Sequence, residues 1–237
     1  MVFRVPIWHC TIVLGIIFCA FSFVEEFSFS KMQIMEYDDP YAVLIIDPGH
    51  GGYDGGASTS DGVKESEINL AISLKLNTIC HLYGIPTVMT RNSETIDYPS
   101  DATTIAQCKK ADQEQRLRLI RDYPYGILFS IHQNYYPAPQ PSGVQVLYGH
   151  DEKSCQLGQI LQTNLCRGLC PDCRRLASEV DEDIYLMKHC GSVSALIECG
   201  FLSNIYESKQ LQNNAYQLKI ATILLSSYME YITQNQK

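Results

Sequence analysis

The alternation of short apolar runs with segments of helical periodicity is the feature that most constrains the fold. Apolar runs bounded by turn residues predict six strands, at Tyr41–Ile46, Pro86–Thr90, Gly126–Ile131, Gly143–Tyr148, Ile184–Met187 and Val193–Ile197. Apolar residues at helical spacing predict helices at Glu65–Tyr83, Thr103–Asp122, Asp151–Gly168 and from Asn204 towards Gln234, with a break near Asn213–Asn214. Strands and helices in this order predict an α/β domain. Its mostly parallel, twisted sheet would be flanked by helices on both faces.

The first 40 residues differ from this pattern. Residues 1–30 contain one basic residue, Arg4, and a mostly apolar run from Val5 to Val24. Such a run predicts a signal peptide or an uncleaved membrane anchor. Residues 31–40 are polar, end in Pro40 and are interpreted as a linker. This leaves residues 41–237 as a single domain, which is long enough to bury one sizeable core.

The charge balance argues against one class of partner. The chain carries 18 Lys and Arg against 26 Asp and Glu, a formal net charge of −8, and no basic cluster stands out. Proteins that bind nucleic acid need Lys and Arg to neutralise phosphates. We therefore expect no nucleic-acid partner.

Four side chains form a candidate catalytic metal site. His50, Glu65 and His132 are two imidazoles and one carboxylate, a donor set found in many catalytic zinc sites that leaves one position open for water. Glu198 is a carboxylate at the end of an apolar run, suited to accept the proton of that water. The sequence thus predicts one zinc ion per chain, with Glu198 as the catalytic residue.

The predicted strands bring these residues to one place. His50, His132 and Glu198 each come just after a predicted strand, and Glu65 begins the first predicted helix. The carboxyl ends of parallel strands meet at the edge of the sheet where ligands bind. His50 lies in a glycine-rich turn that starts at Asp47. We expect Asp47 to fix the tautomer of the His50 imidazole without itself binding the metal.

Several other side chains compete for these roles. A Glu in a first helical turn also favours the helix dipole, which is the structural alternative for Glu65. The remaining histidines are not assigned to the site: His9, His81, His150 and His189. Three of the ten cysteines, Cys166, Cys170 and Cys173, have the spacing C-x3-C-x2-C. Free thiols or a local disulfide are favoured there over an iron–sulfur cluster.

Five strings of the sequence, in this order, resemble a known enzyme family. They are IIDPGHGGYDGGA, GVKESEINLAISLKL, IPTVMTR, FSIHQNYYP followed by SGVQVLYG, and ALIECGFLSN. Together they are similar to the zinc-dependent N-acetylmuramoyl-L-alanine amidases of bacterial cell-wall turnover, over roughly residues 42–232. Within that family, the leader and the strings SIHQNYY and IYLMKH most resemble the germination-specific amidases of the spore cortex.

The resemblance implies an activity and a set of roles. The reaction would be hydrolysis of the amide between N-acetylmuramic acid and L-alanine in peptidoglycan. Zinc would be held by His50, Glu65 and His132, with Glu198 as the catalytic glutamate. Alignment on the following string INLAISL places the second ligand at Glu65, with Glu67 as the alternative. Peptidoglycan is then the expected partner, together with the membrane if residues 1–30 are uncleaved, and an activating protein is left open. We expect action outside the cytoplasm, in the cell wall or the spore cortex.

Two alternatives to this function stay open. The chain could be another zinc peptidase or deacetylase that acts on wall fragments, or a non-catalytic wall-binding module on the same fold. Tyr53, Tyr135 and Tyr136 lie beside the candidate ligands and could stack on a sugar ring, although core packing is an equal alternative for one of them.

Overall fold

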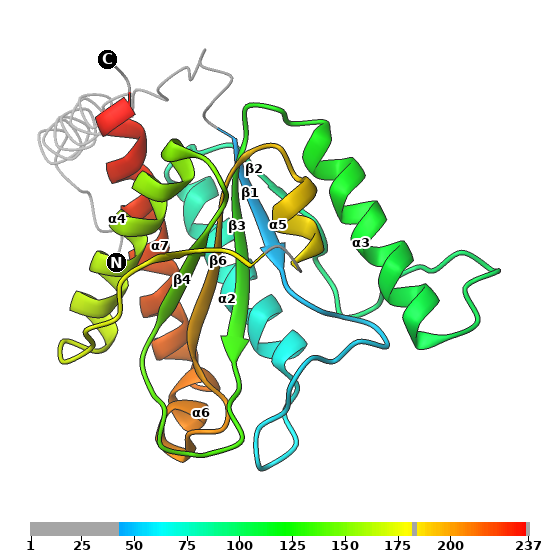
Figure 1. Cartoon of the computed structure of the whole chain (residues 1–237), viewed down its shortest axis with the longest axis horizontal. Helices are drawn as coiled ribbons and strands as arrows, with labels where there is room; N and C mark the ends of the chain where they lie inside the picture. Colours follow the sequence, from blue (N-terminus) through cyan, green and yellow to red (C-terminus); the bar gives the residue numbers. More distant parts are fainter. Residues whose placement is uncertain (1–42, 182–183, 236–237) are drawn as a thin grey trace, which may run out of the picture. The chain divides into compact units, whose positions relative to one another are not determined.

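The computed structural model describes residues 43–181 and 184–235. Its centre is a six-stranded sheet in the order β2-β1-β3-β6-β4-β5 (Figure 1). The strands span Leu44–Pro48 (β1), Thr87–Met89 (β2), Ile127–Asn134 (β3), Gln145–Tyr148 (β4), Ser178–Glu179 (β5) and Val193–Phe201 (β6). The predicted leader, at residues 1–30, and the predicted linker, at residues 31–40, lie outside the described residues.

The sheet is mostly parallel, as predicted. Strands β2, β1, β3 and β6 run in one direction, whereas β4 pairs antiparallel with β6 and carries β5 beside it. The central strands β1 and β3 are buried along nearly their whole length and each begins with three apolar residues, as expected for strands covered on both faces. The α/β fold class inferred from the sequence is therefore confirmed.

Helices cover both faces of this sheet. They span Glu65–Leu82 (α2), Ile105–Arg121 (α3), Glu152–Leu169 (α4), Tyr185–His189 (α5), Ile205–Leu211 (α6) and Asn214–Asn235 (α7). Helices α2, α4 and α7 pack together over one face, where the Tyr228 ring meets the Phe129 ring edge-on at 6.4 Å. Helices α3 and α5 lie over the other face (Figure 1).

Side-chain alternation along the strands explains the two cores. Residues i and i+2 of a strand point to the same face. Ile45, Leu128 and Leu196 face α3 and α5, and they join Leu117 and Met187 in one buried apolar cluster. Phe129, the neighbour of Leu128, points to the opposite core. The polar residues that follow Ile45, Leu128 and Leu196 at i+2 are therefore directed to the α3 and α5 side.

One predicted element is wrong. The run Ile184–Met187 predicts a strand, but residues 185–189 form helix α5. Four apolar residues cannot by themselves distinguish a strand from a short buried helix. Leu186 and Met187 bury against α3 in the helical conformation, which settles the choice. The sequence does not predict the two-residue strand β5, because its residues Ser178 and Glu179 are polar and exposed.

The remaining helices agree closely with the prediction. Thr104 forms a capping box with Gln107 at the start of α3, and Asp151 caps α4. The break near Asn213–Asn214 separates α6 from α7, with Asn213 accepting hydrogen bonds from Ala215 N and Tyr216 N. Within the part of the chain that is described, no helix is both long enough and apolar enough to cross a membrane.

Candidate active site

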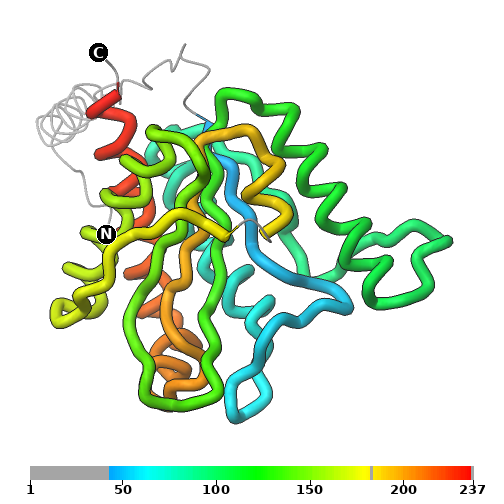
Figure 2. Tube along the Cα trace, in the orientation of Figure 1, coloured from blue at the N-terminus to red at the C-terminus, as the bar shows by residue number. Residues whose placement is uncertain are grey.

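The candidate residues meet where the strand order changes direction. From β1 the chain passes through α2 to β2 on one side, and then through α3 to β3 on the other side of β1. A crevice at the carboxyl ends of such neighbouring strands is the usual ligand site of an open α/β sheet. The loops that follow β1 and β3 lie at the same end of the sheet (Figure 2). His50 follows β1 there, and His132 lies near the end of β3.

Strands β3 and β6 extend further than predicted. The sequence places His132 and Glu198 just past two strands, but β3 continues to Asn134 and β6 to Phe201. Both residues therefore lie within strands, and they are partners in the parallel register of β3 and β6. Register partners on parallel strands point to the same face, so the His132 imidazole and the Glu198 carboxylate share one side of the sheet.

The loop after β1 takes a conformation that the site requires. His50 has a φ of 59°, the only non-glycine residue with a positive φ among the described residues. Gly49 lies directly under the His132 ring, since a Cβ at Gly49 would come within 2.2 Å of His132 Nε2. Gly56 has a φ of 67°, and a Cβ there would come within 2.5 Å of Glu65 Oε2. Glycine at both positions leaves the space that the imidazole and the carboxylate occupy.

Two buried arginines hold this loop from below. Arg91 donates to the carbonyl oxygens of Pro48 and Gly49 at 2.9 and 3.1 Å. Arg116, on α3, donates to those of Pro48 and His50, both at 2.7 Å. Three consecutive carbonyls are thus satisfied by guanidinium groups, which are rigid forks of donors. This explains how a non-glycine residue is kept at a positive φ.

Glu65 is the centre of the cluster. Its Oε1 atom lies 3.3 Å from His50 Nε2 and 3.1 Å from His132 Nδ1. Oε1 also accepts a hydrogen bond from Gln133 N, and Oε2 accepts one from Ala57 N. Burial alone would raise the pKa of Glu65, but His132 and His50 outweigh it and hold that pKa well below the ordinary value. Glu65 is therefore ionised, as a metal ligand must be.

The three residues can hold one cation. Their donor atoms all lie within 4.8 Å of one another. Two imidazoles and a carboxylate are the donors of many three-ligand zinc sites. Glu67, the alternative ligand, is exposed on α2, whereas Glu65 is buried in the cluster. The structure thus brings together the three residues selected from the sequence.

The partner of His50 differs from the expected one. The sequence predicts that Asp47 orients the His50 imidazole, and that prediction is wrong. Asp54 Oδ2 lies 3.0 Å from His50 Nδ1, and Lys109 Nζ lies 3.0 Å from the same oxygen. The hydrogen bond from His50, against the effect of burial, lowers the pKa of Asp54 below its ordinary value. Asp54 therefore leaves His50 Nε2 free to face Glu65.

Asp47 instead forms a buried ion pair. Its Oδ1 atom accepts hydrogen bonds from Arg116 Nη1 at 2.7 Å and from Thr90 Oγ1, and Oδ2 accepts one from Ser130. Burial alone would raise the pKa of Asp47, but Arg116, Ser130 and Thr90 lower it. Asp47 thus positions Arg116, which in turn binds the loop that carries His50.

Glu198 has the surroundings of a general base. Its Oε2 atom is buried and receives no hydrogen bond from any described residue. Burial raises the pKa of Glu198 to about 7, with His132 and His50 opposing the rise and the charge of Glu65 adding to it. A buried carboxylate oxygen without a donor is costly, and such groups concentrate at functional sites. Its titration near neutrality suits proton transfer at physiological pH.

A cavity of about 360 Å³ gives access to this cluster. It lies against α3 and α5, and its lining includes His50, His132 and Glu198. Tyr53, Tyr135 and Tyr136 are all exposed, so the alternative of core packing is wrong for each of them. Tyr53 also stacks on Tyr98, with ring centroids 5.3 Å apart.

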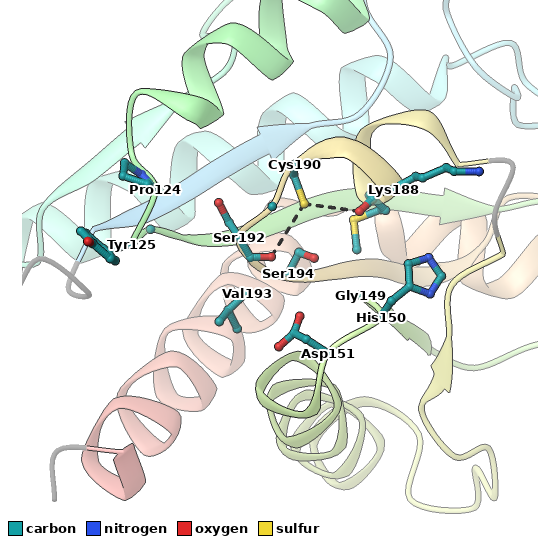
Figure 3. Close-up of a pocket in the computed structure, with 13 residues that line it drawn as sticks. Pro124, Tyr125, Gly149, His150, Asp151, Lys188, Cys190, Ser192, Val193 and Ser194 are labelled. Carbon is teal, nitrogen blue, oxygen red and sulfur yellow. Dashed lines mark hydrogen bonds between the residues drawn. The ribbon is translucent and has the colours of Figure 1, made fainter.

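The other described histidines lie away from the cluster. His81, near the end of α2, contacts Thr87 Oγ1, and His189 is exposed and packs on Tyr185. His150 follows β4 and pairs with Glu179 at 2.8 Å. It lines a second cavity with Ser194, at the start of β6 (Figure 3). Since β4 is antiparallel to β6, this cavity is at the opposite end of β6 from Glu198. His9 lies outside the described residues.

Three supporting residues escaped prediction: Asp54, Arg91 and Arg116. The sequence could have indicated Asp54 as a partner of His50, because it follows His50 by four residues in the same glycine-rich turn. The sequence indication for Arg116 is weaker: this charged residue interrupts the apolar side of α3 next to Leu117, and both residues are buried. We identify no sequence feature that indicates the role of Arg91.

Comparison with known proteins gives a consistent result. The profile of the Amidase_3 family, described as N-acetylmuramoyl-L-alanine amidase, matches residues 44–227. A germination-specific N-acetylmuramoyl-L-alanine amidase of Bacillus subtilis (strain 168) is 31% identical over 225 residues, which are 94% of this chain and 93% of that protein.

Solved structures of amidases are also similar. The CwlD amidase from Clostridioides difficile, in complex with the GerS lipoprotein, superposes with a TM-score of 0.77 at 34% identity. The match covers 81% of this chain and 98% of that chain. The AmiC2 amidase of Nostoc punctiforme has a TM-score of 0.69 at 21% identity, over 81% of this chain and 98% of its own, which is a likeness of fold.

Proposed function

Because the chain belongs to the N-acetylmuramoyl-L-alanine amidase family, we propose that it hydrolyses the amide between N-acetylmuramic acid and L-alanine in peptidoglycan, as a zinc enzyme. The observation that carries the proposal is a single cavity. Its lining includes His50 and His132, which cluster with Glu65, and Glu198, whose buried Oε2 atom has no hydrogen-bond donor among the described residues. Similarity to a germination-specific relative supports a role in remodelling of the spore cortex.

The cluster would hold zinc through His50 Nε2, Glu65 and His132 Nδ1. These donors suit zinc, which binds imidazole nitrogen and carboxylate oxygen. When bound, zinc supplies a Lewis acid that polarises a carbonyl oxygen and makes water acidic near neutral pH. Asp54 fixes the tautomer of His50 by accepting from Nδ1.

Glu198 would move the protons of the reaction. Its free Oε2 is available to accept a proton from the attacking water, since no other donor occupies it among the described residues. The protonated carboxyl is then suited to donate to the leaving amine of L-alanine. A pKa raised by burial makes both directions of transfer accessible near neutral pH.

The substrate presents a sugar and a peptide on opposite sides of the amide. Tyr53, Tyr135 and Tyr136 are exposed aromatic rings on the loops that carry or follow the cluster residues. Exposed aromatic faces stack well on sugar rings. We propose that at least one of these rings binds the glycan strand.

The site of action would be outside the cytoplasm. Peptidoglycan lies beyond the membrane, and residues 1–30 have the composition of a signal peptide or anchor. A fusion of residues 1–40 to a reporter should reach the membrane or the medium. A reporter confined to the cytosol would contradict this. One similar amidase is in complex with a lipoprotein, so we propose that a lipoprotein is also a partner of this chain, testable by co-purification.

The decisive test is zinc-dependent release of stem peptide. Purified cortex or wall is incubated with the wild-type protein and with Glu198→Gln, and new amino termini of L-alanine are measured. Intact muropeptide, glycan strands without peptides and free stem peptide are tested separately. Cleavage of muropeptide alone supports the amidase. Loss of N-acetyl groups from bare glycan would indicate a deacetylase, cleavage of free stem peptide a peptidase, and binding without cleavage a wall-binding module.

A further inference from the structure

Three thiols form a second cluster, away from the candidate active site. Cys166 belongs to the last turn of α4, and Cys170 and Cys173 follow it. The three sulfur atoms lie within 4.8 Å of one another. All three cysteines are half-buried and unbonded to another cysteine in the structure. Two successive backbone hydrogen bonds fold residues 166–173 back on themselves and bring the three sulfur atoms together.

The local backbone produces this approach. Cys170 N donates to Cys166 O at 3.0 Å, and Cys173 N donates to Cys170 O at 2.8 Å. The second bond closes a tight turn through Pro171 and Asp172. A turn of the form Cys-x-x-Cys places two sulfurs on the same side and is common in zinc sites. The preceding Cys166, one helical turn earlier, adds the third sulfur.

We propose that Cys166, Cys170 and Cys173 form a binding site for a thiophilic cation such as Zn²⁺. Soft thiolate donors select this class of metal. Zinc binds thiolate at about 2.3 Å, so sulfurs around one ion lie about 3.8 Å apart, and the three sulfurs here all lie within 4.8 Å of one another. A disulfide would use two of the sulfurs and leave the third without a role. The site is distinct from the cluster at His50 and does not rest on the proposed function.

The cluster can be reached from solvent. A cavity of about 770 Å³, lined by all of residues 169–175, opens the cluster to solvent and gives the ion a path of entry.

The site would tie three segments together. A Cβ at Gly143 would lie 3.3 Å from Cys173 Sγ and 3.6 Å from Cys170 Sγ, so Gly143, two residues before β4, packs on the thiols. Gly143 N donates to Glu207, which also accepts from Phe201 N at the end of β6. Arg175 stacks on the Phe201 ring at 5.0 Å. A cation at the thiols would fix the turn after α4 against β4 and β6.

Cobalt substitution gives the test. The full chain is purified in detergent with a reductant, then freed of reductant and metal without oxygen, and titrated with Co²⁺. We expect a sulfur-to-cobalt charge-transfer absorption, which ligands such as His50, Glu65 and His132 cannot produce. His50→Ala should keep this absorption. In Cys173→Ser, the cobalt affinity measured from this absorption should fall at least tenfold. The triple variant Cys166→Ser/Cys170→Ser/Cys173→Ser should lose the absorption altogether.

A matched control is available on the same helix. Cys155 is a half-buried cysteine of α4 outside the cluster, so Cys155→Ser should retain the absorption in full. Absence of the absorption in the folded wild-type protein would overturn the proposal. A wild-type mass lower by two hydrogens under the same handling, again without the absorption, would also overturn it and assign a disulfide. Because these readouts use the wild type, they stand even if a variant fails to fold.

Discussion

His132 and Glu198 are partners in the parallel register of β3 and β6, and their side chains lie on the same face of the sheet. This pairing sets an imidazole of the metal-binding cluster beside a carboxylate whose Oε2 atom has no donor in the described part of the chain. The distance between the two groups is therefore fixed by backbone hydrogen bonds of two central strands rather than by loops. Sites built on strands are held more rigidly than sites on loops.

Replacement of Glu198 tests the proton transfer. Glu198→Gln keeps the size of the side chain but removes its ability to accept a proton. We expect the rate of muropeptide hydrolysis to fall by about 10²–10⁴-fold, with zinc content and substrate affinity retained. Single-turnover rates, zinc analysis and muropeptide binding check this. Near-normal turnover would mean that another group is the base.

Removal of a cluster imidazole tests the metal centre. His50→Ala and His132→Ala should each lose one zinc equivalent relative to the parent protein. Direct ligand loss should exceed the roughly 10–100-fold affinity loss typical of residues that only orient a ligand. Elemental analysis after dialysis against a weak chelator measures the content. Zinc content equal to that of the parent in both variants would contradict the ligand assignment.

The contact of Asp54 with His50 predicts a smaller effect. Asp54→Ala removes the acceptor of His50 Nδ1, so the imidazole can rotate or change tautomer. We expect zinc affinity at this centre to fall by about 10–100-fold, measured by competition with a chromogenic chelator. Asp61→Ala is the matched control, since Asp61 is an exposed carboxylate of the same connecting segment. Equal affinities for both variants would remove Asp54 from the site.

The close approach of Gly49 to His132 predicts a steric effect. In Gly49→Ala, the added Cβ would lie 2.2 Å from the imidazole, so the ring must move. We expect loss of hydrolysis together with a stability loss of about 1–3 kcal/mol, the usual range for an overpacked site. Gly55→Ala is the control, because a Cβ there meets only the flexible Lys64 side chain, at 3.0 Å. The two variants should differ clearly in activity assays and in urea unfolding.

The buried pair of Asp47 and Arg116 predicts a dependence of stability on pH. Because the pKa of Asp47 is lowered in the fold, ionised Asp47 stabilises the folded state above its unfolded pKa, about 3.9. That contribution is lost as pH falls through the lower, folded pKa. Asp47→Asn removes one of the two carboxylates paired with Arg116 and leaves Asp112, at 2.9 Å from Nε. It should therefore cost no more than about 3–5 kcal/mol at neutral pH, the range for a buried pair that loses one partner.

The difference between wild type and Asp47→Asn should then shrink as pH drops below about 4. Urea unfolding over a pH series measures it. Glu114→Gln is the control, since the exposed pair of Glu114 and Lys110 spans 3.9 Å on the surface of α3. That variant should stay within about 0.5 kcal/mol of the wild type. A constant difference at all pH values would show that the charge of Asp47 is not the cause.

The sequence by itself determined the order of most elements and the residues of the cluster. Apolar runs bounded by turn residues located β1, β2, β3, β4 and β6. The signal is clearest where the run is buried on both faces of the sheet, as at the start of β1 and β3. His50 and His132 could be assigned to one end of the sheet from their places after apolar runs, since parallel strands present their carboxyl ends together. Glu65 could be preferred over Glu67 only through the family resemblance.

Tertiary structure alone decided which groups support the cluster. Asp47 and Asp54 are both acidic residues near His50 in sequence. Asp47 points to α3 and pairs with Arg116, whereas Asp54 pairs with His50. The helical state of residues 185–189 depends on burial of Leu186 and Met187 against α3. The antiparallel direction of β4 depends on its pairing with β6. Each outcome depends on contacts between residues distant in the chain. Local periodicity carries no information about such contacts, because it reports only which face of an element is apolar.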